Sequence, residues 1–228
     1  MQIIPVIDLM AGCVIHARQG RRDQYRPLRT PLCEGSSPHA VIDALLGLHG
    51  FATIYMADLD ALTGRGGQRE LLERLQEDYP ALAFWIDCGL PADGVPSRGR
   101  NVVPVIGSES LDGESLRILP GLRGEFILSL DFMGGRLLGA ESLLEDSSLW
   151  PEKIIIMSLS RVGAGEGPDF QRLEQFRARW PGKQLIAAGG VRGEDDLRRL
   201  DGLGVNGVLL ASALHSGALG RSVLRSYG

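Results

Sequence analysis

The segment VIDLMAG at residues 6–12 returns later in the chain as SLDFMGG at residues 129–135. Asp8, Met10 and Gly12 are each identical to the residue 123 positions further on. Each copy contains or follows a short apolar run, which is typical of a strand covered on both faces. The recurrence of one acid at the end of both runs indicates that the chain contains two related halves.

A second set of matches, at an offset of 101 residues, extends the repeat into the following units. Seven residues of the first half are identical to the residues 101 positions later. The pairs are Met56 and Met157, Gly64 and Gly165, Gly66 and Gly167, Leu72 and Leu173, Glu73 and Glu174, Pro80 and Pro181, and Gly89 and Gly190. The two offsets differ by 22 residues because the first half is longer, and we place the extra length in the loop between Gln19 and Pro38. A run of matches at one offset favours duplication over a chance alignment of common residues.

Short apolar runs alternate with amphipathic stretches along the whole chain. They predict strands at 3–9, 53–59, 83–88, 102–106, 126–132, 153–159, 184–188 and 207–211. Helices are expected at 40–48, 70–78, 142–148, 169–180, 194–203 and 219–227, with a short one after the fourth strand and a missing or reduced one at 91–100. This alternation predicts an α/β fold: a single (β/α)₈ TIM barrel over residues 1–228, a duplicated half-barrel of the phosphate-binding type.

The composition excludes several classes of protein. Hydrophobic residues make up 44% and charged residues 23% of the 228, as in ordinary globular proteins. The net charge is −4 and no basic cluster is present, so we expect no nucleic-acid partner. Neither a membrane-length apolar stretch nor a signal-peptide pattern occurs, so we expect no membrane partner either.

The cysteines and histidines carry little sign of chemistry. Cys13, Cys33 and Cys88 are far apart and odd in number, which favours a reduced, cytoplasmic setting. The four histidines are scattered, so no structural metal is expected. Cys88 stands at a strand end without a predicted histidine neighbour, so we interpret it as a packing residue. The sequence leaves the oligomeric state undetermined.

Acidic residues stand at the ends of several predicted strands, where barrels of this kind place their active sites. Asp8 and Asp131 are repeat mates, so we expect them to face each other across the barrel mouth. Two carboxylates in unlike environments can transfer protons, and we assign both a catalytic role. For Asp58 the sequence favours neither substrate contact nor a structural role. Asp60 and Asp87 are interpreted as helix caps or partners of an arginine.

Glycine-rich strand ends predict a phosphate site, and hence a phosphorylated small-molecule substrate. Gly189 and Gly190 follow the seventh strand, and Ser212 follows the eighth. In such barrels these two loops and a short helix N-terminus hold phosphate through backbone N–H groups. Gly107 and Ser108 are the candidate equivalent in the first half, although a tight turn explains Gly107 nearly as well.

Two loops are candidate lids over this end of the barrel. The loop at 160–169 is long and glycine-rich, and it ends at Asp169, which we expect to cap the next helix. The first loop offers cations to an anionic ligand, although a solvated loop fits most of its residues slightly better. The residues concerned are Arg18, Arg21, Arg22, Tyr25 and Arg26.

In combination these motifs resemble the ProFAR isomerase (HisA) family of histidine biosynthesis, and its sister, the cyclase subunit of imidazole glycerol phosphate synthase. The motifs lie at 4–9, 57–60, 106–108, 128–131 and 188–191, and the resemblance covers essentially the whole chain. The family converts an N-linked ribosyl phosphate from aldose to ketose without a cofactor. The resemblance implies that Asp8 is the general base at the sugar C2 and Asp131 the general acid on the ring oxygen.

The resemblance also implies a set of ligands for a substrate with two phosphates. One phosphate is held by Gly189, Gly190 and Ser212, and Gly107 and Ser108 help to hold the other.

The chain departs from the family pattern at several strand ends. Val162-Gly163-Ala164 stands where the family has Asp-Gly-Thr, so the hydroxyl that assists catalysis is gone. Residues 87–91 replace a glycine-rich run that ends in arginine, and Asp87 puts a carboxylate there, which would repel a phosphate. Ala211 stands where the family often has glycine. One consistent interpretation is a substrate with a single phosphate.

Three functions therefore stay open, since a fold alone does not set a function. The first is the aldose–ketose isomerase that the resemblance implies. The second is a diverged HisA-related enzyme (lyase, condensing enzyme or isomerase) acting on a mono-phosphate substrate. The motif at 57–60 and the basic first loop resemble such a branch, found where methanopterin-type one-carbon cofactors are made. The third is a non-catalytic phosphate-binding subunit, which the presence of both Asp8 and Asp131 disfavours.

Overall fold

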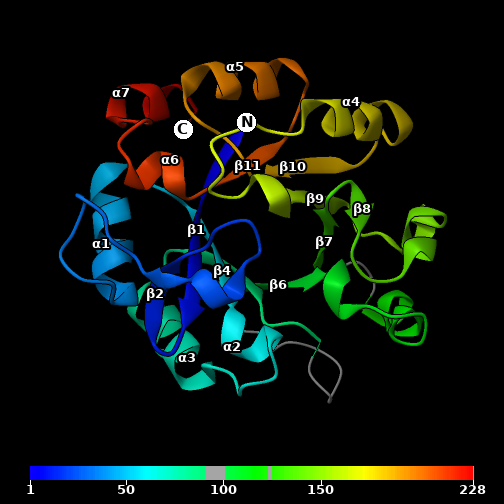
Figure 1. The fold of residues 1–228 in the computed structure, drawn as a ribbon, viewed down its shortest axis with the longest axis horizontal. Helices are drawn as coiled ribbons and strands as arrows, with labels where there is room; N and C mark the ends of the chain where they lie inside the picture. Colours follow the sequence, from blue (N-terminus) through cyan, green and yellow to red (C-terminus); the bar gives the residue numbers. More distant parts are fainter. Residues whose placement is uncertain (91–100, 123–124, 228) are drawn as a thin grey trace.

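The computed structural model describes residues 1–90, 101–122 and 125–227. Within these residues eight parallel strands form a ring, which the pairing of the first with the last closes (Figure 1). The strands are β1 (Gln2–Met10), β4 (Thr53–Asp58), β5 (Ala83–Asp87), β6 (Val102–Gly107), β7 (Ile127–Met133), β9 (Lys153–Ser158), β10 (Gln184–Ala188) and β11 (Gly207–Leu210). The predicted (β/α)₈ barrel is confirmed, and each strand lies within two residues of its expected bounds.

The longer helices lie outside the ring of strands (Figure 1). They are α1 (Pro38–Leu48), α3 (Arg69–Asp78), α4 (Phe170–Arg179) and α5 (Glu194–Gly202). In α3 the buried residues are Leu72 and Leu75, and in α4 they are Leu173 and Phe176, the residues 101 positions later. Each pair forms the narrow apolar stripe by which an amphipathic helix packs on the sheet. The repeat therefore specifies the same helix packing twice.

Some helix predictions are wrong. The expected helix at 142–148 is two 3-10 turns, at Glu141–Leu144 and Ser147–Leu149. Asp146 accepts hydrogen bonds from the backbone N–H and the hydroxyl of Ser148, and such local bonds compete with a helix. The chain before β7 is also 3-10 helix (Ser115–Leu122), with Pro120 inside it. The last helix shortens to α7 (Arg221–Leu224) and a 3-10 turn (Arg225–Tyr227), and the expectation for 91–100 lies outside the described residues.

Each half of the barrel begins with a strand that turns back on itself. β1 pairs antiparallel with β2 (Cys13–His16), and β7 pairs antiparallel with β8 (Arg136–Leu137). Gly12 has φ +77° and its repeat mate Gly135 has φ +89°, a conformation that glycine adopts without steric cost. In the first half, β3 (Arg26–Pro27) continues the hairpin, and this accounts for part of the extra length. The repeated motif thus encodes a strand followed by a hairpin turn.

The strand register refines the alignment of the two halves. Asp8 pairs with Ala57 across β1 and β4, and Asp131 pairs with Met157 across β7 and β9. Ala57 and Met157 are therefore equivalent, so the match of Met56 with Met157 is one residue out. The next strands agree with the expected offset, because Ala57 pairs with Asp87 and Met157 with Ala188. Asp87 and Ala188 consequently hold the same position in the two halves.

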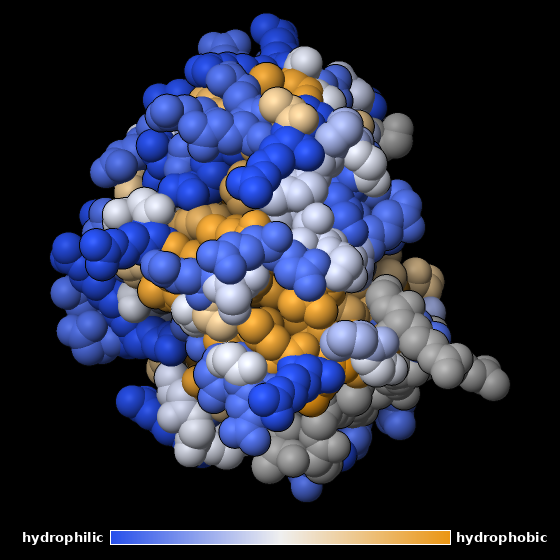
Figure 2. All heavy atoms as spheres, turned by 90° about the vertical axis from the view of Figure 1, so that its right-hand side faces the viewer, coloured by the Kyte–Doolittle hydropathy of each residue, from blue (hydrophilic) through white to orange (hydrophobic). Residues whose placement is uncertain are grey.

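The interior of the ring is filled by side chains rather than open. Its cluster includes Ile4, Trp85, Val105, Ile155 and Leu209, all buried. This packing closes the barrel below its carboxyl end, as is usual for the fold. On the side of β8, shown in Figure 2, the surface is mostly hydrophilic around an apolar area in its middle. No helix among the described residues is long and apolar enough to cross a membrane.

Candidate active site

A cavity of about 460 Å³ opens at the carboxyl ends of the strands. Both halves of the barrel line it, from Val6 and Asp8 on β1 to Leu209 and Leu210 on β11. This is the face on which such barrels carry their chemistry, and the volume suits a small-molecule ligand. The expected location of the site therefore coincides with the cavity.

The structure brings Asp8 and Asp131 together in this cavity. The pKa of both carboxyl groups is raised to about 7, mainly by burial and also by the charge of Asp87, while the hydrogen bond from Ser129 lowers that of Asp131 in part. Their surroundings differ. Asp131 accepts hydrogen bonds from the Ser129 hydroxyl at 2.6 Å and from the Glu109 backbone N–H at 3.3 Å, whereas no described residue donates one to the Asp8 carboxylate. Two carboxyl groups that exchange protons near neutral pH, one fixed and one free, suit paired acid–base work.

A third carboxylate, Asp87, lines the same cavity, so its interpretation as a cap or an arginine partner is wrong. The Tyr55 hydroxyl donates to it at 3.1 Å, and the Gly89 backbone N–H donates at 3.1 Å. Burial raises the pKa of Asp87 to about 6. A Cβ atom at Gly107 would lie 2.9 Å from Asp131 Oδ2 and 3.4 Å from Asp87 Oδ2, so both carboxylates border the space beside this glycine.

The predicted second-half phosphate ligands Gly189, Gly190 and Ser212 all line the cavity. Gly189 has φ +97° and Gly190 has φ +91°. A Cβ atom at Gly189 would lie 2.6 Å from the Ser158 carbonyl, and one at Gly190 would collide with the Gly167 carbonyl. Only glycine fits both positions, and the backbone there can approach a ligand closely. Ser212 opens the short helix α6 (Ser212–His215) beside them.

Three predicted site residues do not line the cavity in the described structure: Asp58, Gly107 and Ser108. The carboxylate of Asp58 accepts from the Ala61 backbone N–H at 3.1 Å and from the Gln68 backbone N–H at 2.6 Å, which caps α2 (Leu59–Leu62). Ser108 is fully buried, and its hydroxyl accepts from the Asp131 backbone N–H at 2.9 Å. Asp58 and Ser108 are thus hydrogen-bonded to the protein itself, and phosphate binding at Gly107 and Ser108 stays a prediction.

Two loops cover the cavity. In the first, Arg22 pairs with Glu109 at 2.7 Å and Tyr25 lines the wall, whereas Arg18, Arg21 and Arg26 are absent from the described lining. The second contributes Val162, Gly163 and Gly165. The Gln19 backbone N–H donates to the Val162 carbonyl at 2.9 Å, which ties one loop to the other. Asp169, at the end of the second loop, caps α4 as expected by accepting from the Arg172 N–H.

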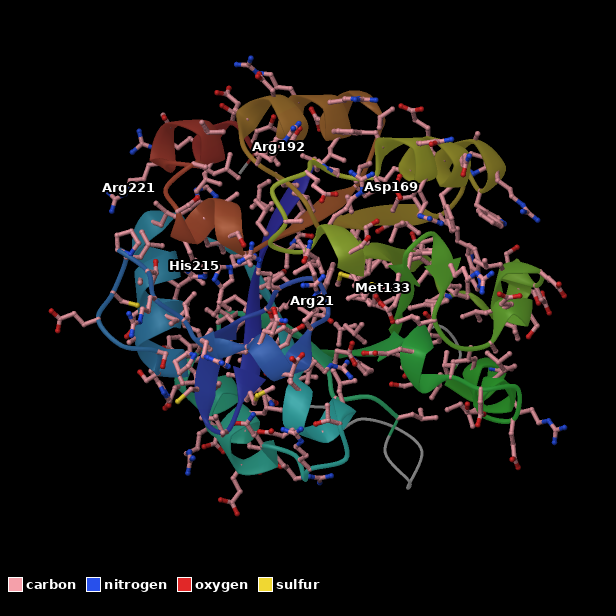
Figure 3. The ribbon with its side chains drawn as sticks, viewed as in Figure 1. Arg21, Met133, Asp169, Arg192, His215 and Arg221 are labelled. Atoms are coloured by element: carbon pink, nitrogen blue, oxygen red, sulfur yellow. The ribbon has the colours of Figure 1, made fainter. Side chains whose placement is uncertain are left out.

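Two histidines lie near Ser212, at the end of the cavity that the second half of the barrel lines. His16 Nε2 lies 3.3 Å from the Ser212 hydroxyl. His215, labelled in Figure 3 at α6, is buried, and its Nδ1 has no partner in the described structure. Its pKa is lowered to about 4, mainly by burial and also by the nearby His16. Figure 3 also shows Arg192 near α5, where it forms an ion pair with Asp196 at 2.7 Å.

Sequence patterns missed Tyr55 and Glu109 as lining residues, although a signal for each was present. Tyr55 stands two residues before Ala57 on β4, and alternate residues of a strand share a face. Glu109 follows Ser108 directly at a predicted strand end. Polar residues at inward positions near strand ends were thus the usable signal.

Comparison with known proteins agrees with this architecture. A family model described as histidine biosynthesis protein matches residues 141–220. Near its full length the chain is similar to imidazole-4-carboxamide (ProFAR) isomerases. It is 26% identical to that of Thermococcus kodakarensis over 96% of this chain and 94% of the relative. It is also 26% identical to that of Cutibacterium acnes, over 95% of this chain and 88% of the relative. The chain is thus similar to HisA-type isomerases over nearly its whole length, at about a quarter identity.

The chain also differs from these isomerases, both in a further comparison and at the site. It is 29% identical, over 96% of its own length and 95% of the relative, to an uncharacterized protein of Methanocaldococcus jannaschii. At the loop position where the family pattern has threonine, Ala164 offers no hydroxyl. The paired aspartates and the second-half glycines nevertheless reach one cavity.

Proposed function

We propose that the protein is a HisA-like sugar-phosphate isomerase that converts an aldose to a ketose in a phosphoribosyl-linked substrate. The observation that carries this proposal is that Asp8 and Asp131 line one cavity, each with a pKa of about 7. At neutral pH such groups exist in both protonation states, so one can donate a proton while the other accepts one.

In the proposed reaction the phosphate binds at Gly189, Gly190 and Ser212, which fixes the sugar across the cavity. Protonated Asp131 donates its proton to the ring oxygen as the C1–O bond breaks, which leaves a protonated imine (C1=N⁺–H). Ionised Asp8 then removes the proton from C2 to give an enolamine. Asp8 then returns its proton to C1 while the C2 hydroxyl gives up its proton to Asp131. This yields the aminoketose and restores both carboxyl groups, with no net change in protons.

The loops supply what this chemistry needs around the two carboxyl groups. Arg22 and Tyr25 close one side and Val162 the other, which keeps bulk water from the intermediates. The Ser129 hydroxyl and the Glu109 N–H hold Asp131 in one orientation. The free carboxylate of Asp8 can rotate toward the substrate carbon.

A specific observation favours a second candidate, a diverged enzyme on a mono-phosphate substrate. Asp87 stands in the cavity on the side where the family pattern implies a second phosphate, and Gly107 and Ser108 do not line it. Ala164 adds the loss of a hydroxyl. The same aspartate pair could then serve a lyase, condensing enzyme or isomerase, because each needs a proton moved next to a carbonyl or imine carbon.

Turnover of ProFAR by the purified protein tests the proposal. We expect the unaltered protein to be active and Asp8→Asn and Asp131→Asn to lose activity by roughly 10²–10⁴-fold, the usual worth of a general acid or base. Asp195→Asn is the matched control, because Asp195 is exposed on α5. A folded protein that leaves ProFAR unchanged would exclude the histidine-pathway substrate and direct the search to mono-phosphates. Full activity of Asp8→Asn would exclude Asp8 as the base.

A further inference from the structure

The two ends of the cavity are equivalent in the duplicated barrel but differ in chemistry. Asp87 and Ala188 hold the same register position, at the ends of β5 and β10. Two residues further on, Gly89 and Gly190 both adopt positive φ, at +71° and +91°. Both strands are therefore followed, at the same place, by a glycine in the left-handed region, although Gly189 also has φ +97° and its counterpart Cys88 does not have positive φ. The side chain before the turn differs as well, a carboxylate at Asp87 and a methyl group at Ala188.

At the second-half end nothing larger than a methyl group occupies the turn. Ala188, Gly189 and Gly190 all line the cavity, and Ser212 lies beside them. This is the end at which we propose that the substrate phosphate binds.

At the first-half end the carboxylate of Asp87 occupies the corresponding turn. The backbone N–H of Gly89, the repeat mate of Gly190, donates to Asp87 Oδ1. The Tyr55 hydroxyl donates to Oδ2 of the same carboxylate. On the neighbouring loop, the Glu109 backbone N–H donates to Asp131. Backbone donors that could hold a second phosphate thus hold aspartates instead.

The charges around this end also oppose a second phosphate. Asp87, Asp131 and Glu109 all line the cavity, and Arg22, which lines it too, is paired with Glu109 at 2.7 Å. Within the described residues no group of three or more acidic, histidine or cysteine side chains is arranged to hold a metal ion. An ammonium group is complementary to these carboxylates, because it donates several hydrogen bonds and carries one positive charge.

We propose that Asp87 takes the place of a second phosphate and makes the first-half end a subsite for an ammonium or amine group. The substrate class is then a mono-phosphate that carries a basic nitrogen at its far end. This inference rests on the proposed phosphate site at Gly189 and Gly190. It goes further by assigning the opposite end and by making Asp87 a specificity-determining residue.

Calorimetric binding of three stable probes to the unaltered protein tests the inference. Glucosamine 6-phosphate and glucose 6-phosphate differ only in an ammonium group against a hydroxyl, and fructose 1,6-bisphosphate supplies a second phosphate. We expect the amino sugar to bind roughly tenfold more tightly than glucose 6-phosphate, the worth of one charge-assisted hydrogen bond, and the bisphosphate to bind most weakly. This comparison depends on no variant's folding.

Two variants locate the effect. Asp87→Asn keeps the shape of the side chain and should remove most of the preference for the amino sugar, whereas Asp195→Asn on the outer surface should keep it. Asp87→Ala copies the second-half residue Ala188 and should strengthen binding of the bisphosphate.

The outcomes separate this inference from the proposed function. If both monophosphates bind equally, or if Asp87→Asn keeps the preference, the ammonium subsite is wrong while the phosphate site stands. If no probe binds, the phosphate site and the inference fall together.

Discussion

Gly190 and Gly135 have nearly the same backbone conformation but different surroundings. Their φ angles are +91° and +89°. A Cβ atom at Gly190 would collide with the Gly167 carbonyl, whereas one at Gly135 would meet nothing within 4 Å. The pair therefore separates the cost of a left-handed conformation from the cost of a steric clash.

We expect Gly190→Ala to lower the free energy of unfolding by about 2 kcal/mol more than Gly135→Ala. Both variants incur the positive-φ penalty, but only the first also forces backbone atoms apart. Urea denaturation of the two variants beside the unaltered protein measures the difference. Equal losses would mean that the Gly167 loop moves away without resistance.

Asp58 gives a second test at this scale, because its two carboxylate oxygens serve the backbone. Asp58→Ala should cost on the order of 2 kcal/mol of unfolding free energy, since it leaves two N–H donors of a buried cap unpaired. Asp58→Asn keeps one acceptor and should recover part of that loss. Affinity for inorganic phosphate, measured by calorimetry, should be unchanged in the Asn variant. A marked loss of affinity would restore Asp58 as a binding residue.

The sequence predicted part of the candidate site at residue resolution. Asp8 and Asp131 were identifiable because the repeat gives both the same place at a strand end. Asp87 was misjudged because its repeat mate, Ala188, carries no polar group, so the motif did not mark it. The roles of Asp58 and Ser108 depend on hydrogen bonds to distant backbone atoms, which no local pattern encodes.

At the scale of elements, strands were predicted better than helices. Buried parallel strands are continuous apolar runs with abrupt ends, so their limits are legible in the sequence. The segments at 115–122 and 141–149 contain enough leucine to suggest helices. Pro120 and the Asp146 side chain favour 3-10 turns there instead. Packing of a few leucines does not require a full helix.

The ion pair between Arg22 and Glu109, two residues that line the cavity, joins the first loop to the segment after β6. Arg22→Gln should loosen the first loop, and chymotryptic cleavage after Tyr25 should become several-fold faster, since a partly exposed pair contributes up to about 1 kcal/mol. Arg21→Gln is the matched control, because Arg21 forms no ion pair within the described structure. Glu109→Gln should give the same acceleration, and the double variant should add nothing to it. Additive effects would show that the two residues act separately.

At the scale of the whole molecule, the cavity makes stability depend on pH in an unusual direction. The pKa values of Asp8, Asp87 and Asp131 are raised to about 7, 6 and 7. A carboxyl group with a raised pKa favours its neutral form in the folded state. Its contribution is therefore fully present below about pH 4 and is lost as the pH rises through 6 to 7.

His215 acts in the opposite sense over part of this range. Its pKa is lowered to about 4, so the folded state loses stability as the pH falls from about 6.5 to 4. As the pH falls from 8 to 5.5, the three carboxyl groups add more stability to the folded state than this one histidine removes. The free energy of unfolding should accordingly be higher near pH 5.5 than at pH 8.

Asp8→Asn isolates the largest expected part of this effect, because no described residue donates a hydrogen bond to the Asp8 carboxylate. At pH 8 the variant should be more stable than the unaltered protein by on the order of 1–3 kcal/mol, and at pH 4 the two should be equal. Urea denaturation at pH 4, 5.5 and 8 measures both proteins. Because the same substitution should abolish turnover, the stability lost by ionising Asp8 would be a cost of the catalytic base. An unaltered protein that is more stable at pH 8 than at pH 5.5 would contradict the buried, proton-holding state of this cavity.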